Sequence, residues 1–516
     1  MNYAELFRVT LPETVLEVAA LLVLIVDLSL LRNAAIKTRA AGSALVGVAG
    51  CVVALWTMSF AGGSGLSAGS DLLLSVGGTA GVAQAAILIL TAITLLLLID
   101  SDFTRHAGEY VAVVLMSAAG GMLISAAQDL LVIFIGLELL SLGLYILTAF
   151  AKKSGKSAEA AMKYYLFGGM SAAFLLFGFS YLYGLSGSTS LPRVVLSTYA
   201  ASASGGSLLL YAALVMVAAG LGFKVAAVPF HLWAPDTYEG APAPAAAFIA
   251  SVSKVASFAL LISISSVALH FFEEIHSTHV KSYVTLRFTN GPVHLTPGIP
   301  SAWPLILMVT AVASMVVGNL AALAQISVRR LLAYSAVAHA GYILLGLAFF
   351  SWNNASASAV LYYILTYGLT TVGAFGVISV VERATGSDRL DAFLGLQKRN
   401  PLLAAVTLVL FLSLAGIPPL VGFWAKFNLF AAVLGVGAGP VALGLVALAI
   451  AMSAVSLYYY LQVLKRVYVM PATDETPIKA HPVTMAVLLA IAAAVVVMGC
   501  FPALLQEWIA SFYPAL

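Results

Sequence analysis

The feature of this sequence that most restricts its fold is a series of apolar runs, which recur from one end of the chain to the other. A run of about twenty apolar residues is long enough to cross a bilayer as a helix. Only 9% of the 516 residues are charged, whereas soluble domains carry about 25%. The sequence therefore predicts an all-α polytopic membrane protein.

The apolar runs predict about fourteen transmembrane helices. Their approximate bounds are 13–31, 42–61, 81–99, 110–126, 130–150, 160–184, 208–229, 241–270, 303–323, 330–350, 357–381, 402–433, 440–464 and 482–505. Of the 24 basic residues, sixteen lie in loops on one side of this map and four on the other. Because basic loops stay in the cytoplasm, we expect both termini on the outer, periplasmic side.

Two of the predicted spans are interrupted by glycine and proline. They read AGLGFKVAAVPFHLWAPDTYEGAPAP (Ala219–Pro244) and LAGIPPLVGFWAKF (Leu414–Phe427). Backbone groups freed by such a break are tolerated inside a membrane only where they face protein or water. The two segments lie five spans apart, an odd offset that reverses their orientation. We therefore predict two inverted five-helix repeats, each with a broken helix; two unrelated proline kinks are the alternative.

These repeats divide the chain into five parts. We expect N-terminal helices in 1–109, the first repeat in 110–270, an external loop in 271–302, the second repeat in 303–466 and a last helix in 467–516. Within the external loop, YVTLRFTNGPVHLT alternates apolar and polar residues around an Asn-Gly turn signal. This pattern predicts a β-hairpin.

One acid and four lysines within or beside the predicted spans are the strongest candidates for a functional site: Glu138, Lys163, Lys224, Lys254 and Lys426. A charged group inside a membrane is costly and marks a functional site by default. A buried lysine near a carboxylate can hold a proton and release it near neutral pH, so a row of such groups bridged by water can pass protons along. The alternatives are a static ion pair that fixes helix packing and, for Lys163, an ammonium group that reaches the inner membrane surface.

Other polar or reactive residues in apolar surroundings carry weaker signals. His231 and His339 could extend a proton relay, although a lone helical histidine is more often a hydrogen-bonded packing residue. Asp27 is expected to pair with a neighbouring helix. Cys51 and Cys500 offer no disulfide framework and no metal or iron–sulfur ligation. Because the sequence also has no glycine-rich nucleotide fingerprint and no basic tract for nucleic acid, we expect no metal, no cofactor and no nucleic-acid partner in this chain.

Several long blocks of the sequence resemble subunit N of the proton-pumping NADH–quinone oxidoreductase, respiratory complex I, within a family of antiporter-like membrane subunits. The blocks are GEYVAVVLMSAAGGMLISAAQDLLVIFIGLELLSLGLYIL, AAMKYYLFGG, GFKVAAVPFHLWAPDTYEGAPAPAAAFIASVSKVASF, GNLAALAQISVRRLLAYSAVAHAGYILLG and LSLAGIPPLVGFWAKFNLF. The likeness spans most of the chain, from about residue 10 to residue 470.

The resemblance implies a role for each intramembrane charge. It implies that Glu138 is the acid of the first half-channel and Lys224 its partner. Lys163 matches a family lysine one helix after the acid. Lys254 matches the central connecting lysine, and Lys426 matches the lysine of the second broken helix.

The resemblance also implies the setting of the protein. Proton translocation would be driven by electron transfer in partner subunits, which hold the NADH, FMN, iron–sulfur and quinone sites. The partners would be other antiporter-like and small hydrophobic membrane subunits in a bacterial plasma (inner) membrane. A subunit of an Mrp-type cation/proton antiporter or a membrane-bound hydrogenase is the near alternative, and GLELLSL together with SVSKVASF favours subunit N. A scaffold whose buried charges only lock helices together is the alternative from another class.

Overall fold

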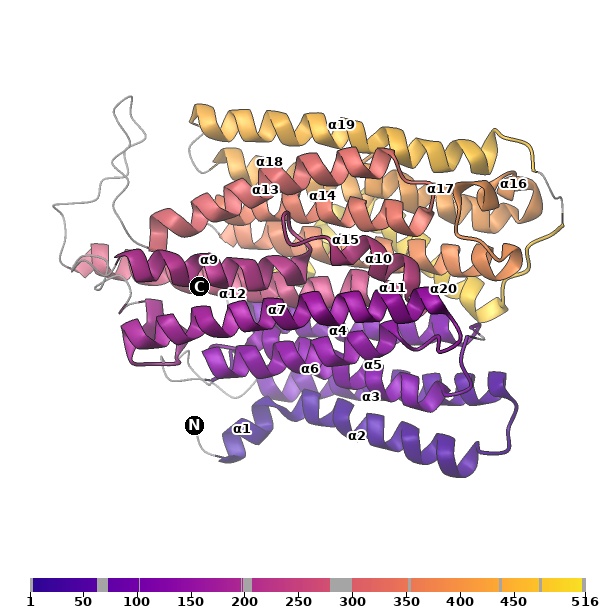
Figure 1. Cartoon of the computed structure of the whole chain (residues 1–516), viewed down its shortest axis with the longest axis horizontal. Helices are drawn as coiled ribbons and strands as arrows, with labels where there is room; N and C mark the ends of the chain where they lie inside the picture. Colours follow the sequence, from indigo (N-terminus) through magenta and orange to yellow (C-terminus); the bar gives the residue numbers. More distant parts are fainter. Residues whose placement is uncertain are drawn as a thin grey trace.

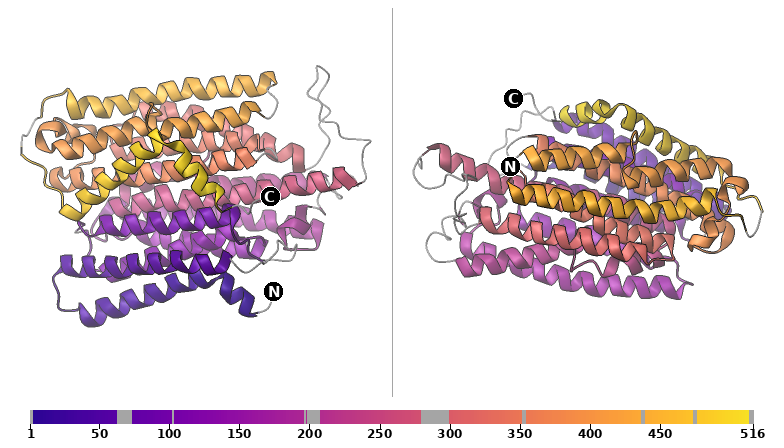
Figure 2. Two further views of the ribbon diagram at one scale, coloured as in Figure 1. Left: turned by 180° about the vertical axis from the view of Figure 1, so that it is seen from behind. Right: turned by 90° about the horizontal axis from the view of Figure 1, so that it is seen from above.

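A computed structural model describes residues 3–62, 73–101, 103–195, 197, 207–278, 299–350, 354–435, 439–472 and 476–512. Long helices run side by side along one axis and form a single bundle (Figure 1). The N-terminal helices lie on one side of the bundle and α19 on the other, while α20 and α21 cross the back (Figures 1 and 2). The two ends of the chain lie toward the same end of the bundle (Figure 1).

The helices before the first break are α1 (Tyr3–Val9), α2 (Leu11–Ile25), the π-helix η1 (Val26–Leu30), α3 (Ile36–Gly62), α4 (Gly78–Leu98), α5 (Ala107–Ala126), α6 (Leu130–Thr148), α7 (Gly155–Ser186) and α9 (Ser207–Val225). The middle of the chain holds α10 (Trp233–Gly240), α11 (Ala243–Phe248), the π-helix η2 (Ile249–Ser253), α12 (Lys254–Thr278), α13 (Ile299–Leu323), α14 (Val328–Ala348) and α15 (Asn354–Thr385). The last elements are the 3₁₀ turn η3 (Leu390–Phe393), α16 (Leu396–Arg399), α17 (Pro401–Ala415), α18 (Val421–Gly435), α19 (Pro440–Tyr468), α20 (Pro482–Cys500) and α21 (Pro502–Ala510).

These helices confirm the predicted fold class. In the described part of the chain, 12 helices are long and apolar enough to cross a membrane, and α17 and α18 are shorter apolar helices. The helix α2 continues directly into η1, so the two together cover the predicted first span. The predicted β-hairpin falls in 279–298, outside the described residues. The helix before it, α12, continues to Thr278, beyond the predicted end of its span at 270.

Capping side chains determine where two of the helices, α6 and α14, begin. Asp129 caps α6 and accepts a hydrogen bond from the backbone N–H of Leu131 at 2.9 Å. Ser327 caps α14 and accepts one from the N–H of Arg330 at 3.2 Å. Such side chains satisfy donors that the first helical turn leaves free.

The same backbone pairing surrounds both caps. At α6, Leu130 N–H donates to Thr189 O (2.9 Å) and Leu191 N–H to Gln128 O (2.8 Å). At α14, Val328 N–H donates to Asp388 O and Leu390 N–H to Ile326 O, both at 2.9 Å. The start of α14 lines a pocket together with the loop that follows α6, so α6 and α14 begin at opposite ends of the bundle. This mirrored pairing is the pattern that two inverted copies of one unit would produce.

Both predicted helix breaks are confirmed. The first separates α9, which ends at Val225, from α10, and Ala226 lies in it with a φ of 59°. A residue with a Cβ rarely adopts this left-handed conformation, which costs about 1–3 kcal/mol. The second break separates α17 from α18, and Gly416 supplies the left-handed residue with a φ of 87°. Each break also contains a cis peptide bond before a proline.

Candidate functional site

The first buried lysine lies at the end of α9, where the helix breaks. Lys224 is 5% exposed. Its ammonium group donates to the hydroxyl of Ser141 on α6. It also lies 5.4 Å from the ring centre of Phe223 and 6.0 Å from that of Tyr145. Ser141 is one helical turn from Glu138, and Lys224 is close enough to feel the charge of that carboxylate. The structure therefore brings the predicted acid and its predicted lysine partner to one site.

The second buried lysine lies at the start of α12 and joins the two halves of the bundle. The Lys254 Nζ donates to the carbonyl of Val225, at the end of α9, at 3.1 Å. It also donates to the carbonyl of Ala336 on α14 at 2.8 Å, and it lies 6.0 Å from the ring centre of Tyr367. Lys254 thus contacts the broken helix of the first predicted repeat and a helix of the second.

The third buried lysine lies just after the second break. The Lys426 Nζ donates to the carbonyls of Leu414 (3.3 Å) and Ala415 (2.9 Å) and to the hydroxyl of Ser453 (2.8 Å). Lys254 and Lys426 therefore bind the carbonyl end of a broken helix in the same way. This end carries the negative part of the helix dipole and favours a cation.

His339 on α14 is buried, and it is close enough to both Lys254 and Lys426 to feel their charges. Its Nδ1 is 2.8 Å from the hydroxyl of Tyr363, and its Nε2 is 3.3 Å from that of Tyr460. Both ring nitrogens therefore have hydroxyl partners that can donate or accept a proton. This geometry is compatible with a relay and with a well-bonded packing residue.

The two remaining predicted residues are Lys163 and His231. Lys163 is partly exposed, with 42% side-chain accessibility, and pairs with Glu159 at 2.7 Å and with Asp236 at 2.8 Å. His231 follows the first break and is buried, and its Nδ1 has no hydrogen-bond partner among the described residues. The structure thus places Lys163 in a charged cluster at the edge of the bundle rather than against Glu138.

Asp27 pairs with a neighbouring helix, as the sequence predicts. It is fully buried in η1, and its carboxylate accepts a hydrogen bond from the Arg39 Nε at 2.8 Å, while a second guanidinium nitrogen of Arg39 also binds it. This forked pair ties the first span to α3. It takes no part in the row of lysines.

Sequence reasoning missed the hydroxyl and amide groups that connect the predicted residues. They are Ser141, Asn319, Tyr342, Tyr363, Ser453, Tyr459 and Tyr460, together with the cluster residues Asp236 and Arg330. A serine or tyrosine in an apolar helix is common and gives no signal on its own. Asp236 lies in the interrupted segment Ala219–Pro244. An acidic residue in such a segment is the sequence feature that could have identified it as a site residue.

The row consists of groups that are able to bind and release protons. Each buried ammonium contacts carbonyl or hydroxyl oxygens, so the lysine can still donate a hydrogen bond when it is neutral. Tyrosine, serine and histidine side chains lie between the lysines and can pass protons. In the described ranges, no group of three or more His, Cys, Asp and Glu side chains could hold a metal ion.

Comparison with known proteins identifies the family of the chain. The family described as "NADH:quinone oxidoreductase/Mrp antiporter, TM" matches residues 127–286 and again residues 285–453. The chain therefore belongs to this class of antiporter-like membrane subunits, and the two matches correspond to two copies of one unit.

Matches over nearly the whole chain identify the family within this class. The chain is 47% identical over 520 residues to "NADH-quinone oxidoreductase subunit N 2" of Acidobacterium capsulatum, and the match covers 99% of each chain. A chain of respiratory complex I from Thermus thermophilus is 33% identical, with a TM-score of 0.74 and coverage of 96% of this chain and 98% of that one. The protein belongs to the subunit N family of NADH–quinone oxidoreductase.

A more distant structure shares the fold alone. A chain of the Mrp complex from Dietzia sp. is 21% identical, with a TM-score of 0.74 and coverage of 98% of this chain and 96% of that one. Chains of respiratory complex I and of an Mrp complex therefore share this fold.

Proposed function

We propose that this chain translocates protons as the membrane-arm subunit N of a bacterial NADH–quinone oxidoreductase. The observation that carries the proposal is the row of three buried lysines, Lys224, Lys254 and Lys426, each bound to carbonyl or hydroxyl oxygens beside a helix break or in the contact between the two halves. An ionisable group buried in a membrane marks a proton or ion pathway by default. Family membership supplies the driving reaction, which is electron transfer from NADH to quinone.

We assign a role to each residue of the row. Glu138 holds the negative charge that favours the charged form of Lys224, and loss of that charge lets Lys224 release its proton. Lys254 accepts it at the contact between the halves, and His339 with its tyrosine partners connects Lys254 to Lys426. His231, beside the first break, is a second possible entry to the row.

The redox groups belong to partner subunits in this proposal. NADH, FMN, iron–sulfur clusters and quinone are assigned to other subunits of the complex. The partners of this chain are the other antiporter-like subunit and the small hydrophobic subunits of the membrane arm, with lipid around them. The division into repeats at 110–270 and 303–466 also belongs to the proposal, and the mirrored caps of α6 and α14 support it.

The buried lysine and its acid provide the direct test of function. In assembled complex reconstituted into vesicles, we expect Lys224→Met to lower protons taken up per NADH oxidised by about tenfold or more, because methionine cannot bind a proton. Glu138→Gln should impair the same step. Lys152→Met, in the exposed loop after α6, is the control and should pump at the parental ratio. An assembled Lys224→Met complex that pumps normally would contradict the proposed function.

The proposed orientation places the basic loops in the cytoplasm of a bacterium. With the exposed Cys500 replaced by serine, we expect Ser188→Cys, in the turn after α7, to react with a membrane-impermeant thiol reagent in right-side-out vesicles. Ala384→Cys, at the exposed end of α15, should react only after detergent is added, because the positive-inside rule places it inside. The opposite labelling pattern would reverse the map.

The near alternative is a subunit of a cation/proton antiporter, since the Mrp chain has the same fold. The subunits that purify with the native protein distinguish the two: dehydrogenase subunits support the proposal, and antiporter subunits without them support the alternative.

A further inference from the structure

The short helix after the first break is held tightly at its first residue. The helix α10 packs between α7 and α14. Trp233 stacks on Tyr164 of α7 with 4.3 Å between ring centres, and its Nε1–H donates to the carbonyl of Phe223 at 2.9 Å. Phe223 directly precedes Lys224 and lies two residues before Val225, whose carbonyl binds Lys254. The position of α10 therefore affects the last turn of α9, which serves two of the buried lysines.

The first turn of α10 also carries a carboxylate that is shared between the two halves of the protein. Asp236 Oδ2 lies 2.8 Å from Lys163 Nζ on α7, and Oδ1 lies 2.6 Å from a guanidinium nitrogen of Arg330 on α14. Glu239, one turn later, lies 3.0 Å from Arg330 and 3.2 Å from Lys156. Asp236 is thus the carboxylate that joins Lys163 to the second half.

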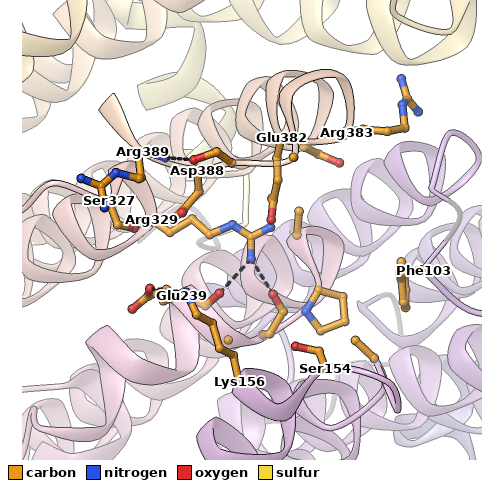
Figure 3. A pocket seen from close by; sticks show the side chains of 18 of the residues that line it. Phe103, Ser154, Lys156, Glu239, Ser327, Arg329, Glu382, Arg383, Asp388 and Arg389 are labelled. Atoms are coloured by element: carbon orange, nitrogen blue, oxygen red, sulfur yellow. Dashed lines mark hydrogen bonds and ion pairs between the residues drawn. The ribbon is translucent and has the colours of Figure 1, made fainter. Parts of the chain in front are cut away.

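A second arginine of α14 holds the backbone of the same segment. Arg329 is 3% exposed and donates to the carbonyls of Ala241 (2.6 Å) and Glu239 (3.3 Å), and it forms an ion pair with Glu382 of α15 (Figure 3). These residues line a pocket of about 770 Å³ at the end of the bundle where the basic loops lie. The arginine pair of α14 therefore binds both side chains and backbone of the segment after the first break.

We propose that Asp236 is a positioning residue, which links Lys163 to Arg330 and thereby sets the position of α10 and of the last turn of α9. Through Trp233, this link determines where Lys224 and the Val225 carbonyl lie. It couples the first part of the relay to the second half of the protein from the basic end of the bundle. The inference rests on the proposed function, because it concerns the regulation of the same relay.

The contacts of Asp236 with Lys163 and Arg330 are not needed to neutralise these two cations. Without Asp236, Lys163 keeps Glu159 at 2.7 Å and Arg330 keeps Glu239 at 3.0 Å. Both cations therefore retain a carboxylate partner, and the helix keeps its Trp233 contact. What disappears is the link from Lys163 through Asp236 to Arg330, while Glu239 keeps a parallel link from Lys156 of α7 to Arg330. Lys156 is 74% exposed and Lys163 is 42% exposed, so the Asp236 link is the less solvated and the stronger of the two. Its loss should therefore appear in coupling before it appears in assembly.

The test compares two acids of the same helix. Asp236→Asn keeps the shape of the side chain and removes the link from Lys163 to Arg330. Glu239→Gln also removes one charge, together with the more exposed parallel link from Lys156 to Arg330, but leaves Lys163 untouched. In reconstituted complex, we expect Asp236→Asn to lower protons taken up per NADH oxidised by about threefold or more, since misplacing a reacting group by about 1 Å can cost two orders of magnitude in rate. Glu239→Gln should stay near the parental ratio, and Asp236→Glu should restore most of the loss.

Each outcome decides the proposal. Equal effects of Asp236→Asn and Glu239→Gln, or an unchanged ratio in both, would overturn it. If Asp236→Asn does not assemble, Arg330→Gln breaks the other end of the bridge and should give the same loss, with recovery in Arg330→Lys. Failure of both to assemble would assign the bridge to stability alone and overturn the positioning role. Lys224→Met in the same vesicles distinguishes a failure of the proposed function from a failure of this inference. If Lys224→Met pumps normally, the proposed function is wrong. If Lys224→Met does not pump while Asp236→Asn pumps normally, only the positioning role of Asp236 is wrong.

Discussion

Replacing Lys254 by methionine is expected to abolish proton uptake by the assembled complex, with a loss of about tenfold or more per NADH oxidised. Among the buried lysines that the structure describes, Lys254 is the one that contacts both halves, through the carbonyls of Val225 and Ala336. Methionine has a similar length and fits a buried apolar site, but it binds no proton. The measurement is proton uptake per NADH oxidised in vesicles, with assembly checked on native gels.

The variant Lys254→Arg tests whether Lys254 provides a fixed positive charge or exchanges protons. If Lys254 only provides a fixed positive charge, Lys254→Arg should keep most of the activity. If it must release a proton, arginine should fail, because its pKa above about 12 prevents deprotonation. Arginine is also larger and forked, so the methionine variant serves as the control for shape.

A nearby substitution controls for disturbance of α12 itself. The hydroxyl of Ser257, one turn along the helix, donates to the carbonyl of Ser253 at 2.8 Å. Ser257→Ala should leave pumping close to parental. A Lys254→Arg complex that assembles and pumps at the parental ratio would show that this lysine does not exchange protons, and the relay would have to connect Lys224 to His339 by another route.

Much of the fold could be predicted because the membrane restricts it so strongly. Apolar runs of the required length identify helices, and backbone breaks at membrane depth are so costly that glycine and proline within a run are informative. Both breaks occur where the sequence indicates, after Val225 and after Ala415. The predicted ends of spans were less accurate, as with α12, because a helix can continue past the apolar run that identifies it.

The lysines could be predicted as site residues because each stands alone in an apolar run. Their partners could not, because backbone carbonyls such as those of Val225 and Leu414 carry no sequence signal. The surroundings of Lys163 were also hidden. Its partner Asp236 is 73 residues away, and only the fold brings α7 beside α10.

The second break offers the prediction with the largest structural effect. Gly422 lies one residue into α18, where the helix passes so close to α17 that an added Cβ would overlap the carbonyl oxygen of Ser413 and lie 2.7 Å from its carbonyl carbon. The N–H of Gly422 also donates a hydrogen bond to the Ser413 hydroxyl at 3.2 Å. The obstacle is backbone, so no side-chain rotation relieves it, and α18 must move away from α17. We therefore expect Gly422→Ala to destabilise the subunit by roughly 3 kcal/mol.

The movement would also separate Lys426 from its ligands, since Leu414 and Ala415 belong to α17 and Lys426 to α18. We expect Gly422→Ala to lower the amount of assembled complex in membranes severalfold, and the complex that does form to pump poorly. The matched control is Gly435→Ala at the end of the same helix, where an added Cβ meets nothing within 4 Å. That variant makes the same chemical change without a collision and should assemble and pump like the parent. If both glycine variants assemble and pump equally well, α18 does not need the close approach at Gly422, and the position of Lys426 must be fixed by Ser453 rather than by the carbonyl end of α17.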